Sequence, residues 1–401
     1  MPVFAIQYLE DSPKIARLTP QAVRQRLQAA FERLPISLVL LGWNLPDALL
    51  DACAEECHRA DAQLYRWHPL LTGDGTFVPR PEWQATGLSG DPVPGFRGMP
   101  EFTFVCPNRP AVQDAVFAHL RDVLRDPRYH GVFLDRIRYP SPAPNPASAF
   151  GCFCEDCQRA AAQEGLDLEA ARRHIVHLIA TPHGAIELVG TLLDPLSAIA
   201  PEPDLLALAA YLDFRVRSIS RFVQQAARLV HETGRAVGLD CFSPALTRMV
   251  GQDLGTLDGC ADWIKIMSYG HTLGPAGVPF ELLGLADWLI EQHGVSEPQA
   301  FALLSSATQL PLPPDRDRLR AHGLPPEALM REAQRARQAG VRTVLAGIEL
   351  VELEGVVQLH DSQIAADVAS FREVGADGLA LSWDLWAIPL DRLSLVRAAW
   401  T

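Results

Sequence analysis

Three features that would indicate other classes of protein are missing from this sequence. Its longest apolar runs, such as residues 36–41, are far shorter than the roughly 20 residues of a membrane-spanning helix. The formal net charge is −13, whereas binding to nucleic acid or to an anionic membrane needs concentrated Lys and Arg. No glycine-rich phosphate loop follows the first expected strand, so a dinucleotide-binding fold is disfavoured. We therefore expect neither a nucleic-acid partner nor a membrane.

The start of the sequence also lacks the charged and apolar regions of a secretory signal. Its first residues, MPVFAIQYLEDSPK, are instead typical of a strand that begins at once. Eight cysteines without a signal peptide suggest a reducing compartment, where clustered thiols hold metal more often than they form disulfides. The expected location is the cytoplasm.

Short apolar runs alternate with amphipathic helical patterns along the 401 residues. Eight runs are expected to be strands, at residues 3–9, 37–43, 63–69, 131–135, 236–242, 263–269, 342–349 and 378–383. Eight strand–helix units in succession predict an α/β fold, a (β/α)8 TIM barrel, rather than an open doubly wound sheet. We expect one barrel over 1–401, with long loops after strands three and four and a loop and helical insertion at about 140–235.

Polar side chains stand where these strands end, and barrel enzymes place their active sites at that face. Asp135, Asp240 and Glu349 end strands four, five and seven and are the candidate catalytic residues. Candidate substrate-binding residues at or near other strand ends are Trp43, Trp67, His68, Arg138, Lys265, Tyr269, Trp383 and Asp384. Aromatic faces stack on sugar C–H surfaces and carboxylates hold hydroxyls, so the pattern predicts a carbohydrate substrate. Paired carboxylates also supply the acid and the nucleophile of glycosyl transfer.

The region around strand four resembles a known family. Cys106-Pro107-Asn108-Arg109-Pro110, a helix, then residues 131–140 (GVFLDRIRYP) and a Cys-x-Cys-x-x-Cys motif resemble the family 42 β-galactosidases and related hypothetical glycosyl hydrolases. Residues 238–244 (GLDCFSP) and 382–385 (SWDL) are similar to such proteins as well. The resemblance implies a barrel glycoside hydrolase, with the closer likeness at 104–158.

The resemblance also implies roles for single residues. The family's acid/base ends strand four and its nucleophile ends strand seven, which correspond to Asp135 and Glu349 here. Tyr269 would support the nucleophile and Trp383 would line the sugar site. The family's acid/base is usually a Glu after an Asn, whereas this sequence has Leu134-Asp135-Arg136. Asp240 therefore stays an alternative as the general acid, and a retaining mechanism is expected.

Three cysteines lie within six residues, Cys152, Cys154 and Cys157, and a closed zinc site needs a fourth ligand. The family resemblance implies that Cys106 is this ligand. We expect a structural Zn²⁺ with no open coordination position, and no catalytic cofactor. Reduced, buried thiols without metal are the alternative.

Two other functions stay open at this point. One is a barrel that binds a saccharide without cleaving it. The other is an aldolase or lyase in which Lys265 forms a Schiff base, although nearby acids would raise the pKa of that lysine rather than lower it. The sequence leaves open whether the chain is a homo-oligomer.

Overall fold

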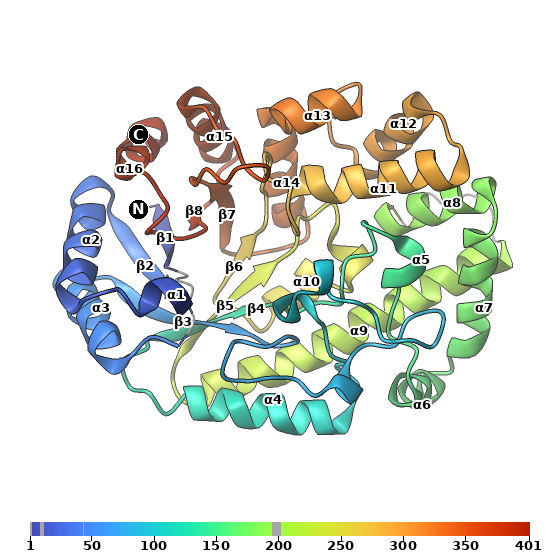
Figure 1. Cartoon of the computed structure of the whole chain (residues 1–401), viewed down its shortest axis with the longest axis horizontal. Helices are drawn as coiled ribbons and strands as arrows, with labels where there is room; N and C mark the ends of the chain where they lie inside the picture. Colours follow the sequence, from blue (N-terminus) through green and yellow to red (C-terminus); the bar gives the residue numbers. More distant parts are fainter. Residues whose placement is uncertain (1, 9–11, 43, 195–201) are drawn as a thin grey trace.

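Eight parallel strands close into a barrel in the computed structural model, which describes residues 2–8, 12–42, 44–194 and 202–401 (Figure 1). Each strand pairs with the next along the chain, and β8 pairs with β1. The (β/α)8 TIM barrel predicted from the sequence is confirmed. The strands are β1 (Val3–Tyr8), β2 (Ile36–Leu41), β3 (Gln63–Pro69), β4 (Gly131–Asp135), β5 (Ala236–Cys241), β6 (Trp263–Ile266), β7 (Val344–Glu349) and β8 (Gly378–Ser382).

All eight strands coincide with expected runs, with ends that differ by at most two residues except at β6, which is three residues shorter than the sequence suggests. β6 ends at Ile266, so Tyr269 lies in the loop that follows and not on the strand. The backbone leaves the sheet here, since the N–H of Ser268 donates to the carbonyl of Ile266 (2.9 Å). Tyr269 nevertheless stays at the carboxyl end of the barrel, 4% exposed.

Large side chains fill the inside of the barrel below its mouth. The buried interior cluster consists of Ala5, Leu38, Leu40, Tyr65, Trp67, Phe133, Trp263, Leu345 and Ala380. The rings of Phe133 and Trp263 stack with centroids 5.1 Å apart. The Trp263 ring occupies the space over Gly238, where an added Cβ would lie 2.1 Å from it. This packed layer closes the barrel from below, so a ligand can approach the strand ends only from the carboxyl face.

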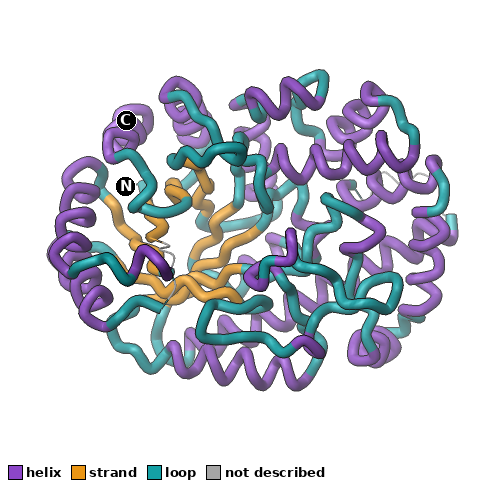
Figure 2. Tube along the Cα trace, viewed as in Figure 1, coloured by secondary structure: helices purple, strands orange, loops and turns teal. Residues whose placement is uncertain are grey.

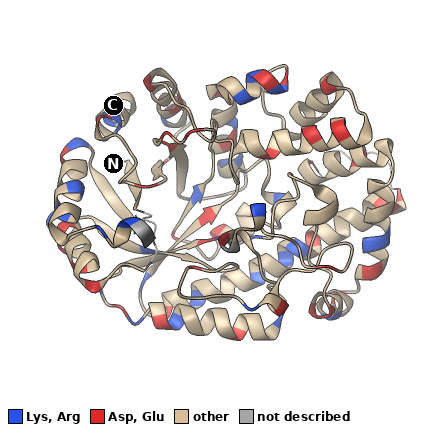
Figure 3. Cartoon of the chain, viewed as in Figure 1, with Lys and Arg blue, Asp and Glu red and all other residues tan. Residues whose placement is uncertain are grey.

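Helices surround the barrel, and α12 (Glu297–Thr308) packs outside this layer against α8 (Pro182–Leu193) and α11 (Val278–His293) (Figure 2). They are α1 (Ser12–Ile15), α2 (Pro20–Arg33), α3 (Asp47–Arg59), α4 (Pro110–Val123), α10 (Leu254–Asp258), α11 (Val278–His293), α12 (Glu297–Thr308), α13 (Arg316–His322), α14 (Pro326–Gln338), α15 (Asp361–Glu373) and α16 (Leu390–Trp400). Figure 3 shows acidic and basic residues interspersed along these outer helices. In the described part of the chain, no helix is long and apolar enough to cross a membrane.

The segment between β4 and β5 forms a helical extension on one side of the barrel, at the right of Figure 1. It contains α5 (Pro146–Ala149), α6 (Glu155–Gln163), α7 (Leu168–Ile179), α8 (Pro182–Leu193) and the 29-residue α9 (Pro203–His231). α9 runs back along the barrel with one apolar face buried, and the chain then enters β5. The long loop after β3 carries three short 3₁₀ turns, at Pro81–Trp83, Phe96–Gly98 and Pro100–Phe102.

Candidate active site

A cavity of about 400 Å³ opens at the carboxyl ends of the strands, within the size range of small-molecule sites. Seven of the candidate residues line it: Trp67, Asp135, Arg138, Asp240, Lys265, Tyr269 and Trp383. They come from five strands or the loops after them and span more than 300 positions of the sequence. The barrel mouth is therefore the candidate active site.

Asp240 is the most unusual acid in this cavity. Its side chain is buried (3% exposed), and its Oδ2 lies 3.0 Å from Nζ of Lys265 on the adjacent strand. Its Oδ1 is buried without a hydrogen-bond partner among the described residues. Burial raises the pKa of Asp240 to about 7; Lys265 opposes this shift, and the nearby Asp135 adds to it. Asp240 can therefore carry a proton near neutral pH, as a general acid must.

Asp135 differs from Asp240 in its hydrogen bonds and in its burial. Nε1 of Trp67 donates to its Oδ2 (2.8 Å), and the backbone N–H of Arg136 donates to its Oδ1 (2.5 Å). Both oxygens thus accept hydrogen bonds from N–H groups that cannot take a proton in return. The side chain is only partly buried and faces the cavity. This arrangement suits a carboxylate that acts as a nucleophile or as a hydrogen-bond acceptor.

Asp135 and Asp240 occupy equivalent positions on neighbouring strands. The last paired residues of β4 and β5 are Leu134 and Leu239, and each acid follows directly. Neighbouring strands lie about 4.8 Å apart, and alternation turns both side chains toward the mouth. The structure thus provides two adjacent carboxyl groups that differ in burial and in hydrogen bonding.

Lys265 is embedded in a polar network under the cavity. Besides Asp240, its Nζ contacts Oε1 of Gln7 (3.4 Å) and lies 5.0 Å from the centre of the Tyr269 ring. Burial by itself lowers the pKa of Lys265, but the charge of Asp240 and the contact with Tyr269 outweigh this and raise it above its ordinary value. The lysine therefore stays protonated and is not available as an amine nucleophile.

Tyr269 and Trp383 form an aromatic wall of the cavity. Their rings meet edge to face, with centroids 6.1 Å apart. The Tyr269 hydroxyl lies 2.8 Å from Oγ of Ser382, which in turn donates to Gln7. Such a wall offers a face for the apolar side of a sugar ring.

Glu349 ends β7 as expected but lies behind the cavity, 1% exposed. Its Oε1 accepts from the backbone N–H of His271 (2.9 Å) and from the hydroxyl of Thr272 (2.8 Å). Thr272 lines the cavity, whereas Glu349 does not. Burial raises the pKa of Glu349, opposed by the nearby His271. Within this geometry Glu349 holds the loop after β6 in place.

Besides Glu349, the candidates Asp384 and His68 do not line the cavity. The remaining candidate, Trp43, falls outside the described residues. Asp384 lies beyond the barrel mouth, where its Oδ1 accepts from the backbone N–H of Trp386 (3.0 Å). His68 follows Trp67 on β3, and because successive side chains alternate, it points outward toward α4.

His68 belongs to a buried group with Asp74 and His119. The two imidazole rings lie 5.1 Å apart, and Nε2 of His119 is 2.9 Å from Oδ2 of Asp74. Burial, together with the neighbouring His119 and Arg66, lowers the pKa of His68 to about 3. His68 is therefore a neutral side chain in the barrel wall and not a sugar ligand.

The cavity also contains residues that the sequence did not single out. Gln7 is a polar residue at an inward position of the otherwise apolar strand β1, so the sequence could have identified it as a candidate site residue. Phe102 and Thr272 come from loops, which carry no periodic pattern that would place them. A second cavity of about 400 Å³ lies outside the barrel near α15, where His271 and Asp367 are already paired with each other (2.8 Å).

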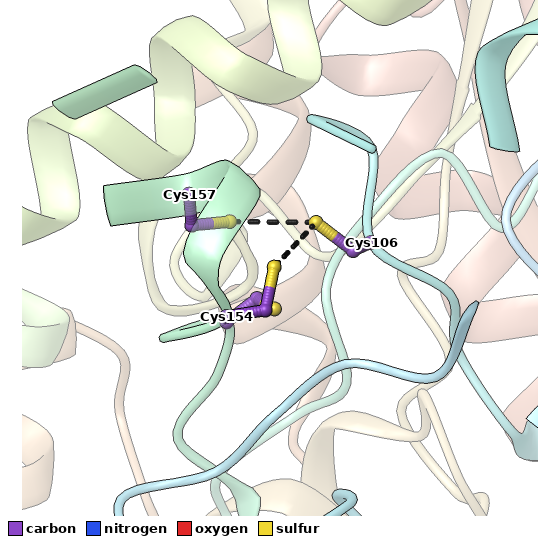
Figure 4. A group of neighbouring side chains, drawn as sticks. Cys106, Cys154 and Cys157 are labelled. Carbon is purple, nitrogen blue, oxygen red and sulfur yellow. Dashed lines mark hydrogen bonds between the residues drawn. The ribbon is translucent and has the colours of Figure 1, made fainter. Parts of the chain in front are cut away.

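The four expected cysteines converge beside the long loops. The sulfurs of Cys106, Cys152, Cys154 and Cys157 all lie within 4.8 Å of one another. Figure 4 shows the sulfurs of Cys154 and Cys157 turned toward that of Cys106, at 3.6 and 3.4 Å. Four Zn–S bonds of about 2.3 Å in a tetrahedron place their sulfurs about 3.8 Å apart. The donor set and its spacing therefore fit a zinc ion.

Comparison with known proteins gives a clear likeness of fold. No family model and no curated protein matches the chain. Solved structures do match: the glycoside hydrolase domain of PgaB (BpsB) from Bordetella bronchiseptica is 13% identical with a TM-score of 0.57, over 99% of this chain and 98% of that one. The chain therefore shares the barrel fold of that domain.

Two further structures share this fold. The β-galactosidase from Marinomonas ef1 is 13% identical over 99% of this chain, with a TM-score of 0.56. The α-L-fucosidase isoenzyme 2 from Paenibacillus thiaminolyticus is 12% identical over 100% of this chain, with a TM-score of 0.56. The chain spans 59% and 49%, respectively, of these two proteins. At such identities the likeness establishes the fold, and the specific resemblance to family 42 stays a prediction.

Proposed function

We propose that the protein is a retaining glycoside hydrolase in which Asp240 is the acid/base and Asp135 is the nucleophile. The observation that carries this proposal is the unequal pair of carboxylates on β4 and β5. One is buried, with its pKa raised to about 7, and the other has both oxygens bound by N–H donors. Environments that separate two carboxylates in this way define the acid and the base of such reactions.

The reaction follows from this pairing. Protonated Asp240 gives its proton to the glycosidic oxygen as the bond to the anomeric carbon breaks. Asp135 attacks that carbon and forms a glycosyl ester, and Asp240, now ionised, takes a proton from the water that hydrolyses it. The two acids end adjacent strands, which lie about 4.8 Å apart, and this is close to the carboxyl spacing of about 5–5.5 Å that retaining enzymes use for direct attack. Lys265 stabilises Asp240 whenever it is ionised.

This proposal differs from the assignment drawn from strand-end placement and the family resemblance, in which Asp135 was the acid and Glu349 the nucleophile. Glu349 is covered by Thr272 and does not reach the cavity, so we reassign it as a positioning residue for residues 271–272. The Schiff-base alternative is disfavoured because Lys265 is protonated and paired. A saccharide-binding barrel without catalysis stays the second candidate, and turnover separates it from the hydrolase.

A panel of 4-nitrophenyl glycosides tests the proposed function. The wild-type protein is expected to release nitrophenol from at least one member, with retention of anomeric configuration in the first sugar product seen by proton NMR. Release with inversion would contradict Asp135 as nucleophile. If sugars bind, as measured by calorimetry, while no member of the panel and no natural oligosaccharide is cleaved, the protein is a binder.

The proposal includes a structural zinc held by the four cysteines. Cys106 lies four residues before the first residue of α4, Cys152 and Cys154 lie just before α6 and Cys157 lies within it, so the ion would tie the loop after β3 to the loop after β4. The N–H groups of Thr86 and Asn108 also point at the sulfurs of Cys152 and Cys157 (3.2 and 3.4 Å). Four thiolates leave no open position, so this zinc would shape the loops rather than take part in the reaction.

We expect about one zinc per chain in protein purified without chelator, because four sulfur ligands form a complete site. Elemental analysis should show that Cys106→Ser and Cys157→Ser lose the metal, with a lower midpoint of thermal unfolding. Cys260→Ser is the matched control, since Cys260 lies outside the group and should leave the zinc in place. A wild-type protein that stays metal-free after zinc supplementation would show that the four thiols are only buried neighbours.

A further inference from the structure

Two arginines line the cavity with most of their hydrogen-bonding capacity unused. Arg138 is 5% exposed, and Arg136 is partly buried beside it. Neither guanidinium has a carboxylate within 4.0 Å among the described residues, although most other buried or half-buried arginines form such pairs or bind several carbonyls. An unpaired buried cation is costly, and a ligand anion would offset that cost.

The orientation of the Arg138 side chain is fixed by its neighbours, but its hydrogen-bonding capacity is only partly used. Its guanidinium lies between the rings of Phe104 and Phe242, 4.7 and 4.9 Å from their centres. Nη1 donates to the carbonyl of Tyr139 (3.2 Å), and Nε is buried without a partner. Burial lowers the pKa of Arg138 to about 10, opposed mainly by the charge of Glu281. The aromatic rings cover the two faces of the guanidinium, so further N–H bonds can be made only at its edge.

Arg136 repeats this arrangement. Its guanidinium lies 4.7 Å from the ring centre of Phe102 and 5.8 Å from that of Trp67. Among the described residues its side chain forms one hydrogen bond, to the hydroxyl of Thr72 (3.3 Å). Its backbone has a φ of 52°, in the left-handed region that favours glycine and strains other residues. Backbone strain, aromatic stacking and unused donors coincide at one residue that faces the cavity.

The balance of charge favours the same ligand chemistry. Arg136, Arg138 and Lys265 line the cavity against two acids, Asp135 and Asp240. Lys265 is already paired with Asp240, and Asp135 is already bound by Trp67 and by a backbone N–H. Three cations against two acids leave one net positive charge among the residues that line the cavity, and the two arginines are the cations without a carboxylate partner, in a chain whose net charge is −13. The planar N–H edge of arginine matches the two oxygens of a carboxylate.

We propose that the sugar bound in this cavity carries a carboxylate, as a hexuronic acid does, and that Arg136 and Arg138 bind that group. Cleavage of such a sugar rests on the proposed hydrolase function. Binding of its carboxylate is inferred from the two arginines alone and does not depend on that function. It identifies uronic-acid-containing glycans as the substrate class.

Calorimetry with methyl glycosides tests the binding directly. Methyl glucuronide and methyl galacturonide are compared with methyl glucoside and methyl galactoside, which differ from them only at carbon six. At least one uronide is expected to bind about tenfold or more tightly than its neutral partner, because hydrogen bonds to a charged group contribute about 1.5–3 kcal/mol. Equal affinities, or tighter binding of a hexose 6-sulfate than of the uronide, would overturn the carboxylate assignment.

Variants show whether the arginines are responsible. Arg136→Gln and Arg138→Gln should each bring the ratio of uronide affinity to neutral-glycoside affinity close to one. Arg80→Gln is the matched control, since Arg80 is exposed and stacks on Trp83 outside the cavity. Thermal unfolding checks that each variant is folded. If Arg138→Gln does not fold, Arg136→Gln still tests the proposal. A preference for the uronide that survives both substitutions contradicts the proposal.

Hydrolysis separates this inference from the proposed function. Cleavage of neutral 4-nitrophenyl hexosides, with no preference for the uronides in kcat/KM or in binding, leaves the hydrolase standing and overturns the carboxylate site. Tight uronide binding without cleavage of any glycoside supports the carboxylate site and overturns the hydrolase.

Discussion

Asp135→Asn is expected to remove almost all glycosidase activity, by roughly four orders of magnitude or more in kcat/KM. The amide that replaces the carboxylate cannot form the glycosyl ester, and this holds whether the leaving group is good or poor. Activated 4-nitrophenyl substrates and natural oligosaccharides should therefore lose activity alike. Added azide is expected to restore turnover of the activated substrate and to give a glycosyl azide of inverted configuration, because the small anion takes the place of the missing oxygen.

Glu349→Gln provides the comparison for this result. The substitution keeps the shape of the side chain and an oxygen that can accept from His271 and Thr272. Activity should fall by about tenfold or less if Glu349 only positions that loop. If Glu349→Gln loses as much activity as Asp135→Asn, with an unchanged midpoint of thermal unfolding, then Glu349 is the nucleophile that the strand pattern predicted.

Asp240→Asn should affect substrates unequally. Natural glycosides need a proton on the departing oxygen, so their kcat/KM should fall by about 10²–10⁴. 4-Nitrophenyl glycosides leave without much protonation, so their first step should be largely spared. Steady-state rates for a series of leaving groups of different pKa measure this difference. A loss that is the same across the series would mean that Asp240 is not the general acid.

The pH profile gives a second measurement on the same residue. The acid must be protonated in the free enzyme, and the pKa of Asp240 is raised to about 7. kcat/KM is therefore expected to be full below this pKa and to fall as the pH rises through about 7. Lys265 lowers the pKa of Asp240, so Lys265→Met should move this limb to higher pH. A limb that stays in place in Asp240→Asn would have to belong to another group.

The sequence was sufficient to place the barrel and most of its mouth. Apolar runs of four to seven residues that end on polar residues marked the strands, and barrel topology then brought Asp135, Asp240 and Trp383 together. His68 could have been placed correctly as well. Side chains alternate along a strand, so it cannot face inward beside Trp67.

Other parts of the site were beyond the reach of sequence periodicity. Glu349 closes its strand as a catalytic acid would, but the loop carrying Thr272 covers it, and loop conformation depends on contacts between distant residues. The aromatic rings that enclose Arg138 come from positions 104 and 242, more than 130 residues apart. The pKa of Asp240 likewise depends on its burial in the closed barrel rather than on its neighbours in sequence.

The polar network below the cavity crosses the join between the first and last strands. Gln7 belongs to β1 and Ser382 to β8, and these strands pair along Ile6 and Leu381. Lys265 of β6 and Tyr269 of the loop after it contact this pair. Asp240, the proposed acid, is therefore linked through Lys265 to the seam that forms only when the two ends of the barrel meet. Loosening of that seam would weaken the support of Lys265 while the surrounding helices were still folded, so the proposed catalysis would depend on closure of the barrel and not only on the presence of its strands.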